Sequence, residues 1–240
     1  MCMFSAPVDS VSQTKIFARR SNRRQWLVYS TNLGSSQDVA MILPIPVERG
    51  AGENAVTFID MSDYTNFFDD LEKGFPRAKS LVDEVGADLS FSFSMLAVHD
   101  VGAFEASFVP TLADFERLDP RFRLPDRVWE RLPQYRDFGF AVFKLRAGSA
   151  EIHPMAFSYP TSVEDLFFPT VHVHDGEVHE LEQFDHTLYG QDETRDDLGG
   201  TEKSALPAVS FMRPHPALAG DRRVHRVSLV GVFDNADVRI

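Results

Sequence analysis

The chain of 240 residues carries 36 acidic and 24 basic residues, giving a formal net charge of −12, and 43% of its residues are hydrophobic. This hydrophobic content excludes a disordered chain, and the length predicts one domain over 1–240 with a substantial core. The negative charge would repel the backbone of nucleic acids, so no nucleic-acid partner is expected.

Short alternating or apolar segments predict strands in the first third of the chain. We expect them over 14–19, 25–30, 39–43 and 56–61, separated by polar turns. The hydrophobic period then becomes helical. Thr65 is the expected N-cap of a short helix that presents Phe67, Phe68 and Leu71 on one face.

The rest of the chain continues this pattern of strands with few helices. Short helices are expected over 76–85, after Thr111 and around Trp129, and strands over 91–99, 104–109, 138–145, 151–157, 167–174, 177–182 and 224–233. The polar stretch 191–203 is interpreted as a flexible loop. Because helices do not alternate with strands, we predict an α+β fold dominated by antiparallel β-sheets, sandwich-like or meandering, with a few short helices.

The segment 171–180, Val-His-Val-His-Asp-Gly-Glu-Val-His-Glu, predicts a β-hairpin. Asp-Gly between alternating residues is typical of a two-residue turn in which both positions have positive φ. Such a turn would place His174 opposite Glu177 and His172 opposite His179. All four side chains would then project from one face of the hairpin.

Three imidazoles and a carboxylate at this spacing suit a divalent transition metal, namely Zn, Fe, Mn, Ni or Cu. We therefore expect His172, His174, Glu177 and His179 as metal ligands, with Glu177 as ligand or general base. His186 is a further ligand or a partner behind the ligands. Two alternatives stay open: this face is the solvated side of a two-stranded ribbon, or its side chains act as acid and base without a metal.

The single cysteine, Cys2, directly follows Met1. If Met1 is removed, the free α-amine can accept the thiol proton, as in N-terminal-nucleophile hydrolases. The order of Cys2, Ala18-Arg19 and Asn22 resembles the start of the choloylglycine-hydrolase and penicillin-acylase branch. The resemblance implies Cys2 as the nucleophile and Arg19 as a contact to substrate or oxyanion, although Asn22 stands near the place where that branch has an acidic residue.

A second resemblance covers about the first fifth of the chain. Cys2 with Phe4, the segment Ile16-Phe17-Ala18, and the run Met41-Ile42-Leu43-Pro44-Ile45-Pro46-Val47 are similar to the opening of an uncharacterised bacterial domain family. The resemblance implies no activity.

Three functions remain open at this point. The first is a metal-binding protein, either a metalloenzyme or not, and the second is an amidohydrolase with Cys2 as nucleophile. The third is a non-catalytic binding module that uses a Phe-rich surface or the arginine-rich turn 19–24. A single cysteine, no signal-peptide pattern and no long apolar run predict a cytoplasmic protein without a membrane span.

Overall fold

The computed structural model of the chain describes residues 3–75 and 105–240. Its strands are β1 (Met3–Phe4), β2 (Ser10–Ser21), β3 (Arg24–Ser35), β4 (Val39–Ile45), β5 (Thr57–Ile59), β6 (Glu105–Val109), β7 (Gly139–Leu145), β8 (Gly148–Pro160), β9 (Phe167–Phe168), β10 (Leu181–Asp192), β11 (Glu202–Lys203), β12 (His225–Asp234) and β13 (Val238–Arg239). Its helical segments are η1 (Ser62–Tyr64), α1 (Phe67–Lys73), η2 (Leu112–Arg117), η3 (Pro120–Phe122), α2 (Asp126–Glu130), η4 (Pro133–Tyr135) and η5 (Ala208–Ser210).

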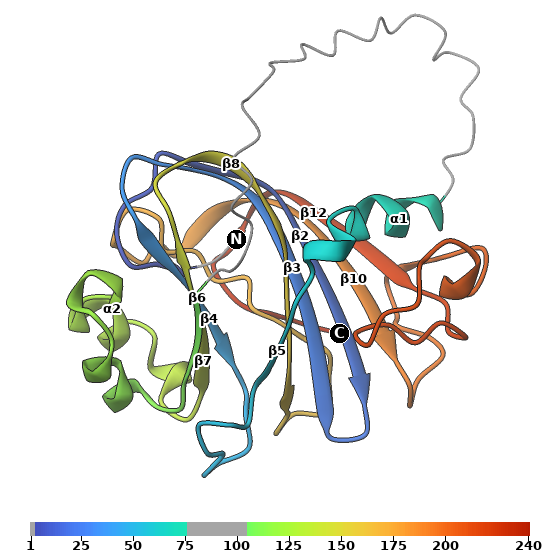
Figure 1. The fold of residues 1–240 in the computed structure, drawn as a ribbon, viewed down its shortest axis with the longest axis horizontal. Helices are drawn as coiled ribbons and strands as arrows, with labels where there is room; N and C mark the ends of the chain where they lie inside the picture. The colour runs from blue at the N-terminus through green and yellow to red at the C-terminus, as the bar shows by residue number, and fades with distance from the viewer. Residues whose placement is uncertain (1–2, 76–104) are drawn as a thin grey trace, which may run out of the picture.

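The strands form two main sheets and a small ribbon (Figure 1). The four-stranded sheet has the order β1-β4-β7-β6, and the seven-stranded sheet has the order β11-β12-β10-β2-β3-β8-β5. Strand β13 pairs with β9 to make the ribbon. Neighbouring strands are antiparallel except β10 and β2, which run parallel.

The two main sheets bury the largest apolar cluster of the protein between them. The seven-stranded sheet contributes Ile16, Tyr29 and Phe157, and the four-stranded sheet contributes Met41 and Phe143. The rings of Phe143 and Phe157 lie 5.8 Å apart, centroid to centroid. Side chains at alternate positions of each strand point into this cluster, which explains the alternation in the sequence.

Helical segments cover part of the outer face of each sheet, so the strand positions beneath them are buried on both sides. Phe17 of β2 packs against Phe67 of α1 at a centroid distance of 5.5 Å. On the other sheet, Ile42 packs in a cluster with Phe115 of η2 and Tyr135 of η4. Figure 1 shows α1 and α2 on opposite sides of the two sheets. Coverage on both faces explains why β4 is an apolar run rather than an alternating one.

The predicted fold class is confirmed, because antiparallel sheets dominate and the described helices are short. The predicted strands over 14–19, 25–30 and 39–43 lie within β2, β3 and β4, respectively. The predicted strand over 224–233 lies in β12 except for its first residue. The predicted helix over 76–85 and the strand over 91–99 lie outside the described residues. Among the described helices, none is long and apolar enough to cross a membrane.

Three local predictions differ from the structure. Helix α1 has Asn66 rather than Thr65 at its N-cap. The expected strands over 167–174 and 177–182 reduce to β9 and the start of β10, and most of β10 was not predicted. The stretch 191–203, expected as a loop, begins with the last residues of β10 and ends with β11. It is anchored in the core by Leu198, which is 2% exposed.

Candidate functional site

The segment 171–180 does not fold as the predicted hairpin. Gly176 has a φ of +86°, but Asp175 is not among the residues with positive φ, so the two-residue turn that needs both does not form. The backbone groups of this segment pair with other parts of the chain instead. Val173 bridges to Met3, and the Asn235 side chain donates hydrogen bonds to the carbonyl oxygens at 172 and 179. The predicted pairing register is therefore wrong.

The five expected metal ligands separate into two groups. His172 and His186 are buried, with 0% and 1% exposure, and His174 is partly buried. Glu177 and His179 lie at the surface. The Glu177 carboxylate is 3.3 Å from the Arg127 guanidinium, and the His179 side chain is 51% exposed. The structure thus brings together His172, His174 and His186, which we call the imidazole cluster.

The imidazole cluster packs around Phe184 of β10. The His172 ring lies 5.1 Å from the His174 ring and 5.2 Å from the His186 ring, centroid to centroid. It stacks on Phe184 at 4.4 Å. His186 belongs to the same face of β10 as Phe184 because the two positions are two residues apart. Glu182, two positions earlier on that face, places a carboxylate oxygen 3.6 Å from Nδ1 of His172.

Burial decides the charge of these imidazoles. It lowers the pKa of His172 to about 2 and that of His174 to about 4, so both are neutral at neutral pH. His179 behaves in the opposite way, since its hydrogen bond to Asp175 raises its pKa. In the described part of the chain, Nε2 of His174 and both ring nitrogens of His186 have no hydrogen-bond partner.

The ring nitrogens of the imidazole cluster do not converge on one point as the side chains stand. Across residues 3–75 and 105–240, no three His, Cys, Asp or Glu side chains are placed to hold a metal ion. Binding of a transition metal therefore stays a prediction.

Cys2 lies outside the described residues. Arg19, the expected contact to substrate or oxyanion, is packed against the sheet. Its guanidinium lies 3.9 Å from the ring centroid of Trp26 and 3.6 Å from the Glu193 carboxylate. Burial lowers the pKa of Arg19. Arg19 therefore contributes to packing at the surface of the seven-stranded sheet, and the amidohydrolase role of Cys2 stays a prediction.

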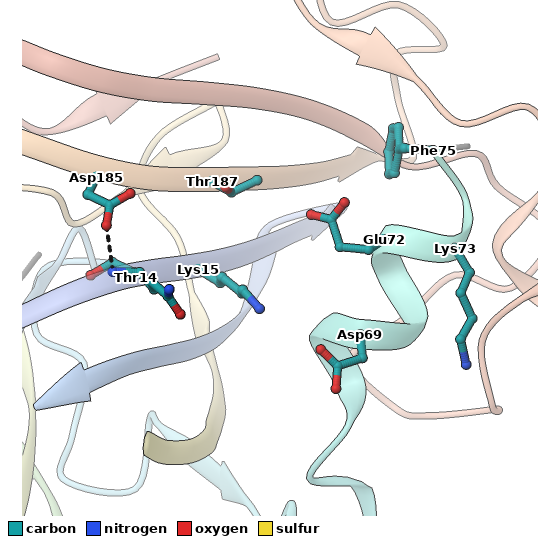
Figure 2. A pocket seen from close by; sticks show the side chains of 9 residues that line it. Thr14, Lys15, Asp69, Glu72, Lys73, Phe75, Asp185 and Thr187 are labelled. Carbon is teal, nitrogen blue, oxygen red and sulfur yellow. Dashed lines mark hydrogen bonds between the residues drawn. The ribbon is translucent and has the colours of Figure 1, made fainter. Parts of the chain in front are cut away.

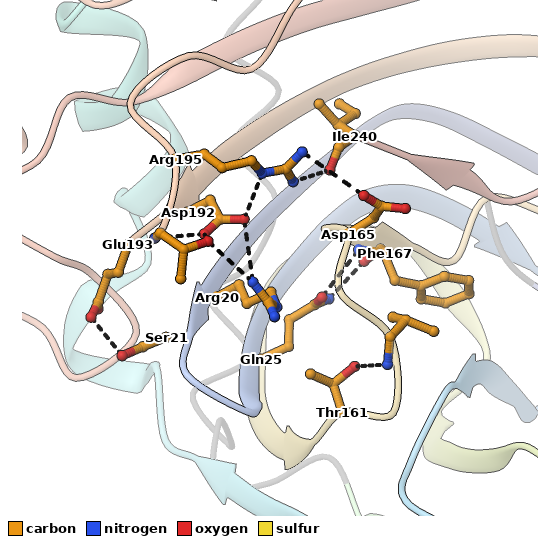
Figure 3. Close-up of polar contacts among 12 residues, drawn as sticks. Arg20, Ser21, Gln25, Thr161, Asp165, Phe167, Asp192, Glu193, Arg195 and Ile240 are labelled. Carbon is orange, nitrogen blue, oxygen red and sulfur yellow. Dashed lines mark hydrogen bonds and ion pairs between the residues drawn. The ribbon is translucent and has the colours of Figure 1, made fainter.

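The arginine-rich turn 19–24 is also engaged with acidic residues of the chain (Figure 3). Arg20 lies 3.6 Å from Asp192, whose side chain is 0% exposed. Arg195 donates to the same carboxylate at 3.1 Å and to the carbonyl oxygen of Ile240 at 2.7 Å. The guanidinium of Arg20 is thus partly neutralised within the fold, which weakens the case for this turn as an anion-binding site.

An open cavity of about 650 Å³ lies on the outer side of the seven-stranded sheet, beside α1 (Figure 2). It is lined by Gln13, Thr14, Lys15, Asp69, Glu72, Lys73, Phe75, Asp185 and Thr187. Both signs of charge line it, from segments far apart in sequence. Sequence reasoning missed this cavity because no local motif marks its residues.

No family model matches the sequence. The fold matches solved structures along nearly the whole chain. The crystal structure of baculovirus P35 aligns with a TM-score of 0.53 and 15% identity, over 99% of this chain and 98% of P35. A mutated baculovirus P35 after caspase cleavage aligns with a TM-score of 0.51 and 15% identity, over 95% of this chain and 99% of P35. At this identity the matches show a shared fold and nothing finer.

Proposed function

We propose that this chain is a non-catalytic binding protein whose partner is a caspase-type cysteine protease. One observation carries the proposal. The fold corresponds from end to end to that of P35, and one P35 structure is that of a protein cut by a caspase. Because the alignment leaves almost no part of either chain uncovered, the likeness concerns the whole architecture rather than a common motif. It favours the binding-module hypothesis over the metal and amidohydrolase hypotheses.

The described surface supports binding through aliphatic rather than aromatic side chains. Most phenylalanines of the described chain are buried. Among the exposed large hydrophobic residues of that part of the chain, Phe233, with 40% exposure, is the single phenylalanine. Val230 and Val232 on β12 are 69% and 63% exposed. In the described chain, residues 227–234 of β12 pair on one side only, with β10. An open strand edge with apolar side chains is a surface that proteins use to bind extended segments.

The test is to incubate the purified full chain with active initiator and executioner caspases and with caspase-like proteases of other lineages. We expect loss of protease activity on a fluorogenic peptide together with a stoichiometric complex in size-exclusion chromatography. Intact mass then distinguishes a single cut, expected here, from general degradation. The control is the same protease with its catalytic cysteine replaced. Full activity, no complex and no single cut with every protease would contradict the proposal.

Two variants then locate the contact. If a single cut occurs, its fragment masses identify the residue before the cut bond, and alanine at that position is expected to abolish cleavage. Val230→Ser combined with Val232→Ser is expected to weaken the complex. Val209→Ser is the matched control, because Val209 is 65% exposed but lies on η5, outside strand β12. Equal binding by the double variant would exclude the β12 edge as the contact.

A further inference from the structure

A second cavity, of about 210 Å³, lies where β10 ends and β12 begins. Four basic side chains line it, namely Arg195, Lys203, Arg222 and Arg223. The lining also includes a histidine that is 5% exposed, His225, and three carboxylates, those of Asp192, Asp196 and Asp221. With a neutral imidazole the lining carries one net positive charge, although the chain as a whole carries −12. We call it the basic cavity, and its charge favours an anion.

The cations of the basic cavity are held in place but are only partly neutralised. Arg222, Lys203 and Arg223 each donate to a backbone carbonyl oxygen, at 2.9, 2.6 and 3.3 Å. Arg222 is also paired with Asp196 at 2.7 Å, and the buried carboxylate of Asp192 is shared by two arginines (Figure 3). Lys203 and Arg223 have no carboxylate partner among the described residues. Because carbonyl contacts already orient these two cations, a ligand that they bind has less ordering to bring about.

The basic cavity also offers hydrogen-bond acceptors. Nδ1 of His225 lies 2.8 Å from the hydroxyl oxygen of Thr201, and that hydroxyl donates its only hydrogen to the carbonyl oxygen of Leu198. Nδ1 must therefore carry the ring proton, which leaves Nε2 as an acceptor. Burial lowers the pKa of His225, so the imidazole is neutral at neutral pH. The exposed carboxylate of Asp221, which has no ion pair in the described part of the chain, is a second acceptor.

We propose that the basic cavity binds one inorganic phosphate ion in its dihydrogen form. Lys203 and Arg223 donate hydrogen bonds to its two unprotonated oxygens. Its two hydroxyl groups donate to Nε2 of His225 and to the carboxylate of Asp221. The single negative charge of the ion matches the net charge of the lining. The volume suits a small oxyanion, because sites for drug-sized ligands measure about 300–1,000 Å³. None of these residues belongs to the β12 edge that the proposed protease contact uses.

The two acceptors make the site selective among anions. Sulfate has the same tetrahedral shape but no hydroxyl group at neutral pH, so it would leave both acceptors unsatisfied and facing its own oxygens. A phosphomonoester loses its last hydroxyl hydrogen at about pH 6 and has the same disadvantage above that pH. Inorganic phosphate, by contrast, keeps a large dihydrogen fraction at pH 7. The proposal therefore separates inorganic phosphate from the two anions that it most resembles.

The experiment is isothermal titration calorimetry of the purified full chain with sodium phosphate at pH 7 and constant ionic strength. Sodium sulfate and glycerol phosphate are the comparison ligands. We expect one phosphate per chain, and binding of the comparison ligands that is weaker by about tenfold or more. Arg223→Gln is expected to lower the phosphate affinity about tenfold, because it removes a charged donor. Arg146→Gln is the matched control and should leave the affinity unchanged, since Arg146 is exposed and lies between β7 and β8.

A second variant tests the acceptors without depending on a buried side chain. Asp221→Asn replaces an exposed acceptor with an amide that can also donate, so the difference between phosphate and sulfate affinity is expected to narrow. Circular dichroism verifies that the variants are folded. The proposal is overturned if the wild type binds no phosphate, or if sulfate or glycerol phosphate binds as tightly as phosphate. It is equally overturned if Arg146→Gln weakens binding as much as Arg223→Gln, or if Asp221→Asn leaves the difference between the two anions as it is in the wild type.

Discussion

Acidification should destabilise this protein through His172 and His174. Burial holds the pKa of the two side chains at about 2 and about 4, below the value of about 6.5 for an unfolded histidine. The unfolded chain therefore takes up protons first as the pH falls. The stability that depends on neutral imidazoles is fully present above pH 6.5 and is lost progressively towards the folded-state pKa values.

The magnitude follows from these pKa values. Each histidine costs about 1.4 kcal/mol per pH unit between its unfolded and folded pKa. From pH 6.5 to pH 5 this amounts to about 2 kcal/mol for each residue and about 4 kcal/mol for both, a large part of the stability of an ordinary domain. Asp237 acts in the opposite sense. Loss of water contact raises its pKa to about 6, so its protonation stabilises the fold as the pH falls below 6.

Because Asp237 opposes the effect of the histidines, the experiment compares the loss of unfolding free energy on acidification in wild type and in a variant without the two imidazoles. Urea denaturation of the EDTA-treated protein at pH 8 and pH 5 gives the free energy of unfolding of wild type and of His172→Leu with His174→Leu. The double variant is expected to lose about 4 kcal/mol less than wild type over this range. His179→Ala, at the surface, is the control and should lose no less than wild type, because the raised pKa of His179 adds stability as the pH falls. An equal loss in wild type and the double variant would show that the two imidazoles are not buried in the neutral form.

Three further substitutions, one of them with a matched control, test the packing by thermal or urea denaturation. Asp192→Asn should lower the free energy of unfolding by about 3 kcal/mol, because it removes a carboxylate with a 0% exposed side chain from between two arginines. The control Asp196→Asn, at 89% exposure, should lower it by less than about 1 kcal/mol. Similar losses of stability in the two variants would contradict the difference in burial. Gly190→Ala should cost about 1–3 kcal/mol, since a Cβ there would lie 2.9 Å from Leu166, and an unchanged midpoint would mean that this side chain yields freely. Phe157→Ala, at 0% exposure between the two sheets, should cost about 3–5 kcal/mol, and a loss below 1 kcal/mol would contradict its place in the core.

The strands that the sequence predicted correctly are those with a strong local signal. Strands β2 and β3 alternate around a polar turn, and β4 is an apolar run that contains Pro44 and ends just before Pro46. Strand β10 was largely missed because its inward-facing positions include Glu182 and His186 as well as Phe184 and Leu188. Polar residue types at buried positions hide the alternation. Its parallel pairing with β2 joins residues that are far apart in sequence, as His186 lies beside Thr14.

The candidate site was predicted in part. A period of two placed His172 and His174 on one face, and both contact the same cluster. The Asp-Gly signal failed because a longer-range partner competes for the backbone. The amide group of Asn235 bonds to the carbonyl oxygens of His172 and His179, which fixes the segment in a shape that turns His179 outwards. No property of residues 171–180 themselves reveals a partner more than fifty positions away.

The parallel pair of β2 and β10 has a consequence for synthesis of the protein. While the ribosome is still translating the middle of the chain, β2 can already pair with β3, but the strand on its other side does not yet exist. Until residues 186–192 are made, the edge of β2 that later pairs with β10 has unsatisfied backbone groups. Pairing of segments so distant in sequence is slow, and such exposed strands invite aggregation. We expect truncated forms that end before residue 181 to require a chaperone to remain soluble.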